Sequence, residues 1–271
     1  MKKSNAVLLS TPYIVWMVVF TLIPLGVVCF YALTDAVGNF TLDNIIGLGA
    51  YLPVLWQSIL YSLAAAVICL LLGYPVAYYI SHRSPTAQKF LYMLIMLPMC
   101  MSFLLRTLAW VGLLQDTGII NDLLAALGLP RLQLIRTPGA VILGMVYNYL
   151  PYMILPLYST ILKIDHRLVE AAEDLGCTPA ETFRKVTLPL SMPGIISGLT
   201  MVFVPAVSTF YISQKLGGAG TVLIGDVIER MFKQGNNANL GAALSLLLMV
   251  LVFVCTGIMN RLGGDTEEVV I

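Results

Sequence analysis

Apolar residues occur along this chain in six long runs, and polar stretches separate them. A transmembrane helix needs about 20 mostly apolar residues to cross the hydrocarbon core of a bilayer. Every run reaches that length, so the pattern predicts an all-α membrane protein with six spans in one domain. The expected spans are Leu8–Leu33, Val54–Ile80, Gln88–Leu114, Ala140–Leu162, Leu188–Ile212 and Leu240–Arg261.

Composition supports this interpretation. Of the 271 residues, 59% are hydrophobic and 11% are charged, whereas a soluble domain usually carries about 25% charged residues. The first apolar run begins near Ala6 and is much longer than the apolar core of a signal peptide, so we expect it to be retained as a helix. The five cysteines are scattered singly, which argues against disulfides and zinc sites.

Basic residues predict the orientation, because Lys and Arg concentrate in cytoplasmic loops. With a cytoplasmic N-terminus, the inner side holds Lys2, Lys3, Arg83, Lys89, Lys163, Arg167, Arg184, Lys185 and Arg261. The outer side then holds Arg131, Arg136, Lys215, Arg230 and Lys233. The excess on the inner side predicts that both termini are cytoplasmic, and it puts the loop at about residues 163–187 on the same side.

That loop is unusually polar for this chain, with nine charged residues from Lys163 to Lys185. Its first part, HRLVEAAEDL, is typical of a helix, and helical spacing gathers its apolar residues on one face. These residues are Leu168, Ala171, Ala172 and Leu175. Gly176 follows as an expected C-terminal cap, because glycine tolerates the left-handed backbone conformation.

A second helix is expected directly after this glycine. Thr178 suits the N-cap, Pro179 suits the first helical position, and Glu181 completes a T-x-x-E capping box. The loop is therefore expected to be a helix, a glycine turn and a second helix that leads into the fifth span at Leu188-Pro189.

Two roles fit such a loop, a helix lying on the lipid surface or a docking site for another protein. Lipid-surface helices favour basic residues and bulky apolar anchors. An anionic leaflet would repel acidic residues that this loop presents, among them Glu170, Glu173, Asp174 and Glu181. The small side chains of Ala171 and Ala172 suit the close approach of a protein backbone. The residues favour docking, and the lipid-surface role stays open at this point.

The loop resembles the EAA loop of ABC importer permeases of the type I superfamily. The matching residues are Glu170-Ala171-Ala172, Gly176, Val186 and Leu188-Pro189, and valine at 186 replaces the commoner isoleucine. In that superfamily the fold has six spans, and the cytoplasmic loop between spans four and five is a coupling helix that docks into an ATPase. The resemblance implies that ATPase coupling rests on Glu170, Ala171, Ala172, Gly176, Leu188 and Pro189.

The resemblance also implies partners. No G-x-x-x-x-G-K-[ST] phosphate-binding motif occurs in the sequence, so ATP and Mg are expected on a separate dimer of ATP-binding subunits. We expect no cofactor, metal site or catalytic residue in this chain, which is a transport subunit rather than an enzyme. A second permease subunit forming a heterodimer and an extracellular or periplasmic substrate-binding protein are implied. The expected location is the bacterial plasma (inner) membrane, with lipid as surroundings and no role for nucleic acid.

Three further stretches resemble the spermidine/putrescine permeases of that superfamily: Leu72–Ile80, Val146–Asp165 and Phe210–Ile228. They imply uptake of polyamines by alternating access. One alternative is a permease for another small solute, such as thiamine, iron or an organic anion. A second is an ion-coupled secondary transporter, which would need ion ligands within the membrane, where Arg106 is the only clear charge.

Four residues of the third and fourth spans are candidates for a gate or pathway: Arg106, Tyr147, Asn148 and Tyr152. A charge inside a membrane is costly and is usually buried in protein or faces water. Arg106 is therefore either a gate locked to Asn148 or to a partner subunit, or a structural arginine. The tyrosines either line a cation path through cation–π contacts or pack and anchor the helices.

The outer loop Gln214–Leu240 is long and glycine-rich, and its glycines include Gly217, Gly218 and Gly220. It is expected either to contact a substrate-binding protein or to cover the pathway as a re-entrant cap. Within the fifth span, the spacing of Gly194 and Gly198 is the small-xxx-small pattern that permits close approach of two helices. Prolines inside the spans act either as hinges or as simple kinks.

Overall fold

The computed structural model describes residues 12–35, 37–234 and 237–263. The described chain is helical, and its only β pairing is an isolated bridge between Thr34 and Phe40. Among these residues, five helices are long and apolar enough to cross a membrane, or six if the bent pair Pro179–Leu190 and Met192–Val207 counts as one span. The predicted all-α membrane fold is therefore confirmed. Residues 8–11 of the first expected span, and the two lysines before it, lie outside the described residues.

The chain forms two compact units, which are described separately. The first unit is Met1–Pro53 with Val227–Leu251, and the second is Val54–Asp226 with Val252–Ile271.

In the first unit, the helical segment Pro12–Ala32 ends next to a tight loop. It contains a π-helical turn, η1 (Val18–Leu22), and then α2 (Ile23–Ala32). The loop leads through α3 (Asp43–Ile46) and η2 (Gly47–Tyr51).

Small residues form the core of this first unit. Ala32 packs against Ala242 and Ala243, which belong to α15 (Ala238–Gly263). The Asn239 side-chain amide donates to the Thr34 carbonyl oxygen, so the start of α15 is fastened to the loop that follows α2.

Most of the second unit is helical. The helices that lie wholly or mainly in it are α4 (Leu52–Ser81), α5 (Pro85–Met96), η3 (Leu97–Cys100), α6 (Phe103–Leu114), α7 (Ile119–Ala126), α8 (Pro138–Ile161), α9 (His166–Asp174), α10 (Pro179–Thr182), η4 (Phe183–Thr187), α11 (Leu188–Leu190), α12 (Met192–Val207), α13 (Tyr211–Leu216) and the start of α14 (Ile224–Lys233).

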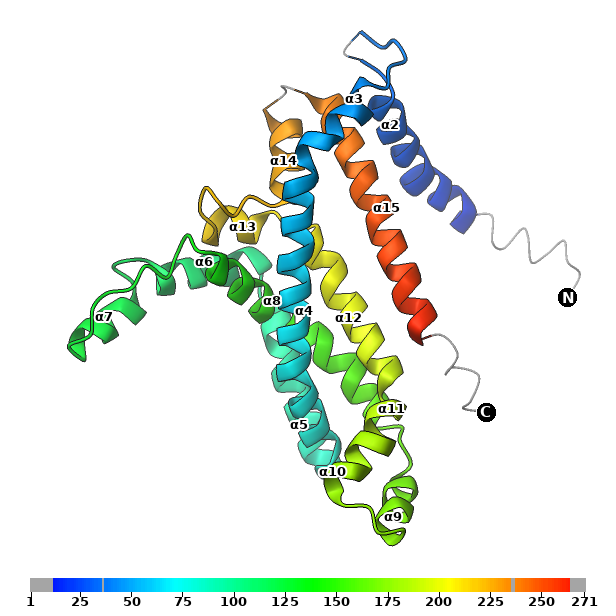
Figure 1. Cartoon of the computed structure of the whole chain (residues 1–271), viewed down its shortest axis with the longest axis vertical. Coiled ribbons are helices and arrows are strands. Elements are labelled where there is room, and N and C mark those ends of the chain that lie inside the picture. Colours follow the sequence, from blue (N-terminus) through cyan, green and yellow to red (C-terminus); the bar gives the residue numbers. More distant parts are fainter. Residues whose placement is uncertain (1–11, 36, 235–236, 264–271) are drawn as a thin grey trace, which may run out of the picture. The chain divides into compact units, whose positions relative to one another are not determined.

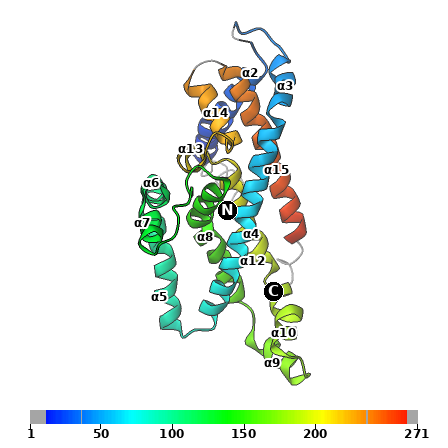
Figure 2. The same cartoon turned by 60° about the vertical axis from the view of Figure 1, so that its left-hand side comes forward.

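Helix α8 is the centre of the second unit. In its apolar 18-residue stretch, 61% of the residues are buried, whereas the corresponding share is 28% for the segment that contains α4. Met145, Met153 and Leu157 on α8 are completely buried in one hydrophobic core. Helix α12 runs alongside α8, and α4 contributes residues such as Ala65 and Cys69 to the same hydrophobic core. Helices α9 and α10 lie at one end of this group (Figures 1 and 2).

Two glycines let α12 approach α8 closely. A Cβ atom added at Gly194 would lie 2.8 Å from Thr160 Cβ, and one at Gly198 would lie 3.2 Å from the Met153 carbonyl oxygen. Such distances leave no space for a side chain, so the small-xxx-small prediction for this pair is confirmed.

The third expected span, Gln88–Leu114, is not one continuous helix. Helix α5 ends at Met96, η3 follows, Met101 is extended with ψ 148°, and α6 begins after Ser102. Pro98 supplies no N–H, which weakens the α-helical bonding pattern at this point, and the Pro98 carbonyl accepts a 3.1 Å hydrogen bond of the 3₁₀ type from Met101 N–H. The helical segment that is long and apolar enough for a span is Phe103–Ala126, in which α7 follows α6.

The fifth expected span, Leu188–Ile212, is bent and interrupted. Its axis turns by 62° at Ser191, between α11 and α12. Helix α12 ends at Val207, and α13 begins separately at Tyr211. The remaining expected spans correspond to helices that start and end within a few residues of the predicted bounds, apart from α4, which the segment Asp43–Tyr51 precedes.

Candidate functional site

The polar loop contains a short, well-capped helix, α9. The Asp165 carboxylate caps its start by accepting a 3.0 Å hydrogen bond from Arg167 N–H. At its end, Gly176 N–H donates to the Glu173 carbonyl and Cys177 N–H donates to the Ala172 carbonyl. This pair of bonds is a Schellman motif, which needs a left-handed residue, and Gly176 supplies it with φ +84°.

The second helix of the loop, α10, starts with the capping box that the sequence predicts. Glu181 N–H donates to Thr178 Oγ1, and Thr178 N–H donates to the Glu181 carboxylate at 3.0 Å. The Thr178 hydroxyl and Lys185 also donate to this carboxylate. These donors, the Thr178 backbone N–H first, lower the pKa of Glu181 from 4.5 to about 2. Glu181 is therefore ionised at physiological pH, which is the form that accepts these bonds.

The first helix presents an apolar face outward. Leu168 is 49% exposed and Leu175 is 86% exposed, and Ala171 between them is exposed as well. Ala172 is turned inward and is only 9% exposed. The predicted shared face is thus divided, with three members available to a partner and one packed within the loop.

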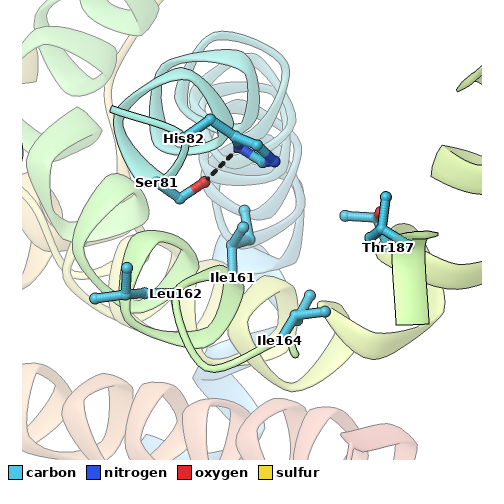
Figure 3. Close-up of a pocket in the computed structure, with 7 residues that line it drawn as sticks. Ser81, His82, Ile161, Leu162, Ile164 and Thr187 are labelled. Atoms are coloured by element: carbon cyan, nitrogen blue, oxygen red, sulfur yellow. Dashed lines mark hydrogen bonds between the residues drawn. The ribbon is translucent and has the colours of Figure 1, made fainter. Parts of the chain in front are cut away.

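A cavity of about 260 Å³ lies behind α9, between the loop and the ends of α4 and α8 (Figure 3). Its wall is formed by Ser81, His82, Ile161, Leu162, Ile164, Val169 and Thr187. His82 Nδ1 lies 2.8 Å from the Tyr78 carbonyl oxygen, which accepts a bond if this nitrogen carries the proton. The loop is therefore not packed solidly against the helix ends that it covers.

The loop re-enters the helical core at Leu188-Pro189, close to a buried polar contact. Leu188 packs partly into the core, and Ser191 three residues later is completely buried. The Ser191 hydroxyl contacts the Tyr74 hydroxyl of α4 at 2.9 Å. Sequence reasoning did not select Tyr74 or Ser191 as a pair, and the only local signal is a serine between Pro189 and Pro193.

The four gate candidates occupy different environments. Arg106 is 7% exposed, and its Nε and Nη1 atoms have no hydrogen-bond partner among the described residues. Asn148 is 1% exposed, and its side-chain amide donates 2.9 Å back to the Gly144 carbonyl of its own helix. No hydrogen bond joins Arg106 to Asn148 within the described part of the chain. Tyr147 and Tyr152 are 37% and 38% exposed, and Tyr147 meets the ring of Trp110 edge-on at 5.4 Å.

The glycines of the outer loop are mostly packed against neighbouring segments. A Cβ atom at Gly217 would lie 2.4 Å from the Ser213 carbonyl oxygen, and one at Gly218 would lie 2.8 Å from the Arg136 carbonyl oxygen. Gly220 has open space around it, and its carbonyl accepts a 2.9 Å bond from the Gln57 side chain of α4. At the start of this loop Gln214, Lys215, Ala219 and Gly220 are exposed, whereas Gly217 and Gly218 are half-buried.

Among the described residues, no group of three His, Cys, Asp or Glu side chains is arranged to hold a metal ion.

Comparison with known families gives one match over most of the chain. Residues 69–265 match the family described as "binding-protein-dependent transport system inner membrane component".

Curated relatives share substantial identity with this chain. The spermidine/putrescine transport system permease protein PotB of Haemophilus influenzae is 41% identical over 247 residues, which cover 88% of this chain and 86% of that protein. PotB of Escherichia coli is 39% identical over 217 residues, which cover 79% of each chain.

Solved structures share the fold at lower sequence identity. A chain of a bacterial ABC transporter involved in the import of the acidic polysaccharide alginate superposes with a TM-score of 0.82, 18% identity and 97% coverage of both chains. A chain of the MetNI methionine ABC transporter, in inward-facing conformations, has a TM-score of 0.61 and 18% identity, covering 78% of this chain and 94% of that one.

Proposed function

Because this chain belongs to the family of binding-protein-dependent transport system inner membrane components, we propose that it is the membrane-spanning permease subunit of an ATP-driven importer of spermidine and putrescine. The observation that carries the substrate is the 36–41% identity to PotB proteins of several bacteria over most of the chain. The solved structures support the fold alone, since their identity to this chain is 18%.

In this proposal the loop of α9 and α10 is the docking element for the ATPase. Its caps hold the helix–glycine–helix shape without help from a partner. Leu168, Ala171 and Leu175 supply exposed apolar contacts, and Glu170 lies on the same short helix. ATP and Mg would be bound by the ATPase dimer, and this loop would lie on the cytoplasmic side together with both chain termini.

A second permease subunit would complete the pathway. PotB is named as one component of a spermidine/putrescine system, and we expect the partner to be a related but distinct, PotC-like chain forming a heterodimer. A substrate-binding protein would dock outside the membrane, and exposed residues of the outer loop, among them Ala219 and Gly220, are the contact that we expect from this chain.

Transport would proceed by alternating access. ATP binding draws the two ATPase subunits together and shifts the population of two arrangements of the helices, since a ligand favours the state that it binds better. The bent passage from α11 to α12 is the element of this chain that joins the loop to the helical core. Movement of α9 and α10 would therefore reach α12 directly through Leu188-Pro189.

The proposal is tested by reconstituting this chain in proteoliposomes with its ATPase, the second permease subunit and the binding protein. Uptake of radiolabelled spermidine and putrescine should require ATP. The ATP must be on the side of the vesicle membrane that carries the ATPase. Labelled thiamine serves as the control solute and should not accumulate.

Two results would contradict the proposal. Uptake that persists without the ATPase would remove the ABC mechanism. Accumulation of thiamine, with no accumulation of either polyamine, would leave an ABC permease with a different substrate.

A further inference from the structure

Helix α4 holds the re-entry bend of the loop through one side chain, Tyr74. The Tyr74 hydroxyl lies 2.9 Å from Ser191 Oγ. Ser191 has one hydroxyl proton, which it directs to the Leu188 carbonyl oxygen 2.9 Å away. With Ser191 donating to Leu188, the Tyr74 hydroxyl is free to donate and Ser191 to accept, although either hydroxyl can supply the proton of this contact. Tyr74 is 9% exposed and Ser191 is completely buried, so water does not compete for this bond.

The bend lies where the backbone is poor in amide donors. Pro189 and Pro193 have no N–H, so two carbonyls around Ser191 lack their usual helical partners. The helix axis turns by 62° here, between α11 and α12. Ser191 N–H still donates to the Thr187 carbonyl at 3.0 Å, and Ile195 N–H donates to the Ser191 carbonyl at 3.0 Å. The missing proline donors leave the bend fewer backbone bonds than a regular helix has, so side-chain contacts add to its restraint. The Tyr74–Ser191 bond is one such restraint, and it comes from a different helix.

Phe183 gives α4 a second hold on the same segment. Its ring meets Tyr74 edge-on with centroids 5.6 Å apart and meets Tyr78 edge-on at 5.9 Å. Edge-to-face aromatic pairs at this separation are favourable beyond the area that they bury. Phe183 begins η4, directly after α10, so residues 183–191 are fastened to one turn of α4 at both of their ends.

That turn of α4 is a weak point of its own helix. Pro75 follows Tyr74 inside α4 and removes a backbone donor. On the other side of Tyr74, a Cβ atom at Gly73 would lie 3.1 Å from Met153 Cγ of α8. The contact from the loop thus reaches α4 where that helix bends most easily, next to its close packing on α8.

We propose that Tyr74 is a positioning residue that makes α4 move together with α12 when the loop moves. The inference rests on the proposed function, because it assumes that an ATPase displaces α9 and α10. Displacement of the loop pulls on Phe183 and Ser191, and both transmit the pull to Tyr74. Without the Tyr74 hydroxyl, the loop still docks and α12 still moves, but α4 follows less faithfully and ATP hydrolysis becomes uncoupled from transport.

The test compares Tyr74→Phe with the unaltered chain in the complete complex in proteoliposomes. Both ATP hydrolysis and uptake of radiolabelled spermidine are measured, and the result is expressed as spermidine imported per ATP hydrolysed. We expect this ratio to fall roughly three- to tenfold, the factor that one neutral hydrogen bond is worth, while ATP hydrolysis itself is maintained. A purely structural role would lower both activities together and leave the ratio unchanged.

The matched control is Tyr79→Phe on the same helix. Tyr79 is 53% exposed. The Arg83 guanidinium carbon lies 4.1 Å from the centroid of its ring, and phenylalanine retains this ring. Its ratio should equal that of the unaltered chain. If Tyr74→Phe also keeps the full ratio, the inference is wrong, although the proposed function would stand. If the unaltered complex shows no ATP-dependent uptake, the proposed function itself fails.

A second variant approaches the bond from its other end. Ser191→Ala should lower the ratio as Tyr74→Phe does, and the double variant should be no worse than the poorer single variant, because the two groups share one interaction. Independent, multiplying losses in the double variant would show that the two side chains act separately and would overturn the inference.

Discussion

Single residues give the loop of α9 and α10 its shape mainly through backbone conformation. Gly176 has open space around it, so no steric contact requires glycine there. Its φ of +84° does require it, because an L-residue in the left-handed region is strained by roughly 1 to 2 kcal/mol. The glycine of the EAA pattern is thus explained by the Schellman cap that ends α9.

Replacing Gly176 by alanine should loosen this cap. The strain of roughly 1 to 2 kcal/mol should speed hydrogen exchange of the Cys177 amide about tenfold, since 1.4 kcal/mol corresponds to a factor of ten. Mass-resolved exchange of the loop peptides measures the effect. Gly112→Ala is the control, because Gly112 lies inside α6 with open space around it. In this variant, the amides of the loop should exchange at the same rate as in the unaltered chain. Equal exchange in both variants would contradict the role of the left-handed backbone.

The capping box makes a pH prediction at the same scale. Glu181 has its pKa lowered to about 2, so its contribution to the loop is fully present above pH 4.5 and is lost as the pH falls toward 2. The side-chain carboxyl ¹³C shift of Glu181 should therefore titrate well below 4.5. Thr178→Val removes one of the donors and should raise the midpoint part of the way. A midpoint near 4.5 in the unaltered chain would mean that the box does not form in solution.

At the scale of helices, the sequence signals that succeed are local and those that fail are long-range. The cap at Gly176 and the box from Thr178 to Glu181 involve residues only a few positions apart, so their chemistry is visible in the sequence. The Tyr74–Ser191 contact joins residues 117 positions apart, and no periodicity reveals it. The only clue in the sequence is that Ser191 lies between Pro189 and Pro193. This position does not indicate which residue the serine contacts.

Prolines show the same limit. Pro98 coincides with the break between α5 and α6, whereas Pro75, Pro151 and Pro156 lie inside continuous helices. A missing N–H weakens a helix equally at each position. Neighbouring helices decide whether the weak point opens, and these neighbours are not evident from the local sequence. The third span was therefore predicted as one helix, although the structure divides it.

The contact between α8 and α12 should be sensitive to side-chain size. Gly194→Val places a Cβ atom against Thr160 and the Pro156 carbonyl, and overpacking of this kind costs roughly 1 to 3 kcal/mol. The apparent Tm of the purified chain in detergent should fall. Ser197→Val makes a similar change on the exposed side of α12 and should leave the Tm nearly unaltered. The same decrease for both variants would show that close packing at Gly194 is not the cause.

At the scale of the whole molecule, the basic residues predict the orientation in the membrane, and this prediction is open to a direct test. In a variant whose native cysteines are replaced, Leu175→Cys introduces a thiol at a position that is 86% exposed, and Ala219→Cys introduces one in the outer loop. An impermeant maleimide should label the first only in inside-out vesicles and the second only in right-side-out vesicles.

Cys69, kept as the single cysteine, is the control for access. It is completely buried and should remain unlabelled from either side. The reverse pattern for the two introduced cysteines would put α9 outside the cell, where no ATPase could reach it, and the coupling proposal would be overturned.

The short range of the contacts within the loop has a consequence for how the protein is made. The cap at Asp165, the Schellman bonds and the box up to Lys185 all join residues within a few positions of each other. Helical turns form in about a microsecond or less, while a ribosome adds only about 5 to 20 residues per second. The loop can therefore form these local bonds while α12 is still being synthesised, and under the docking proposal an ATPase would meet a loop that already has its caps.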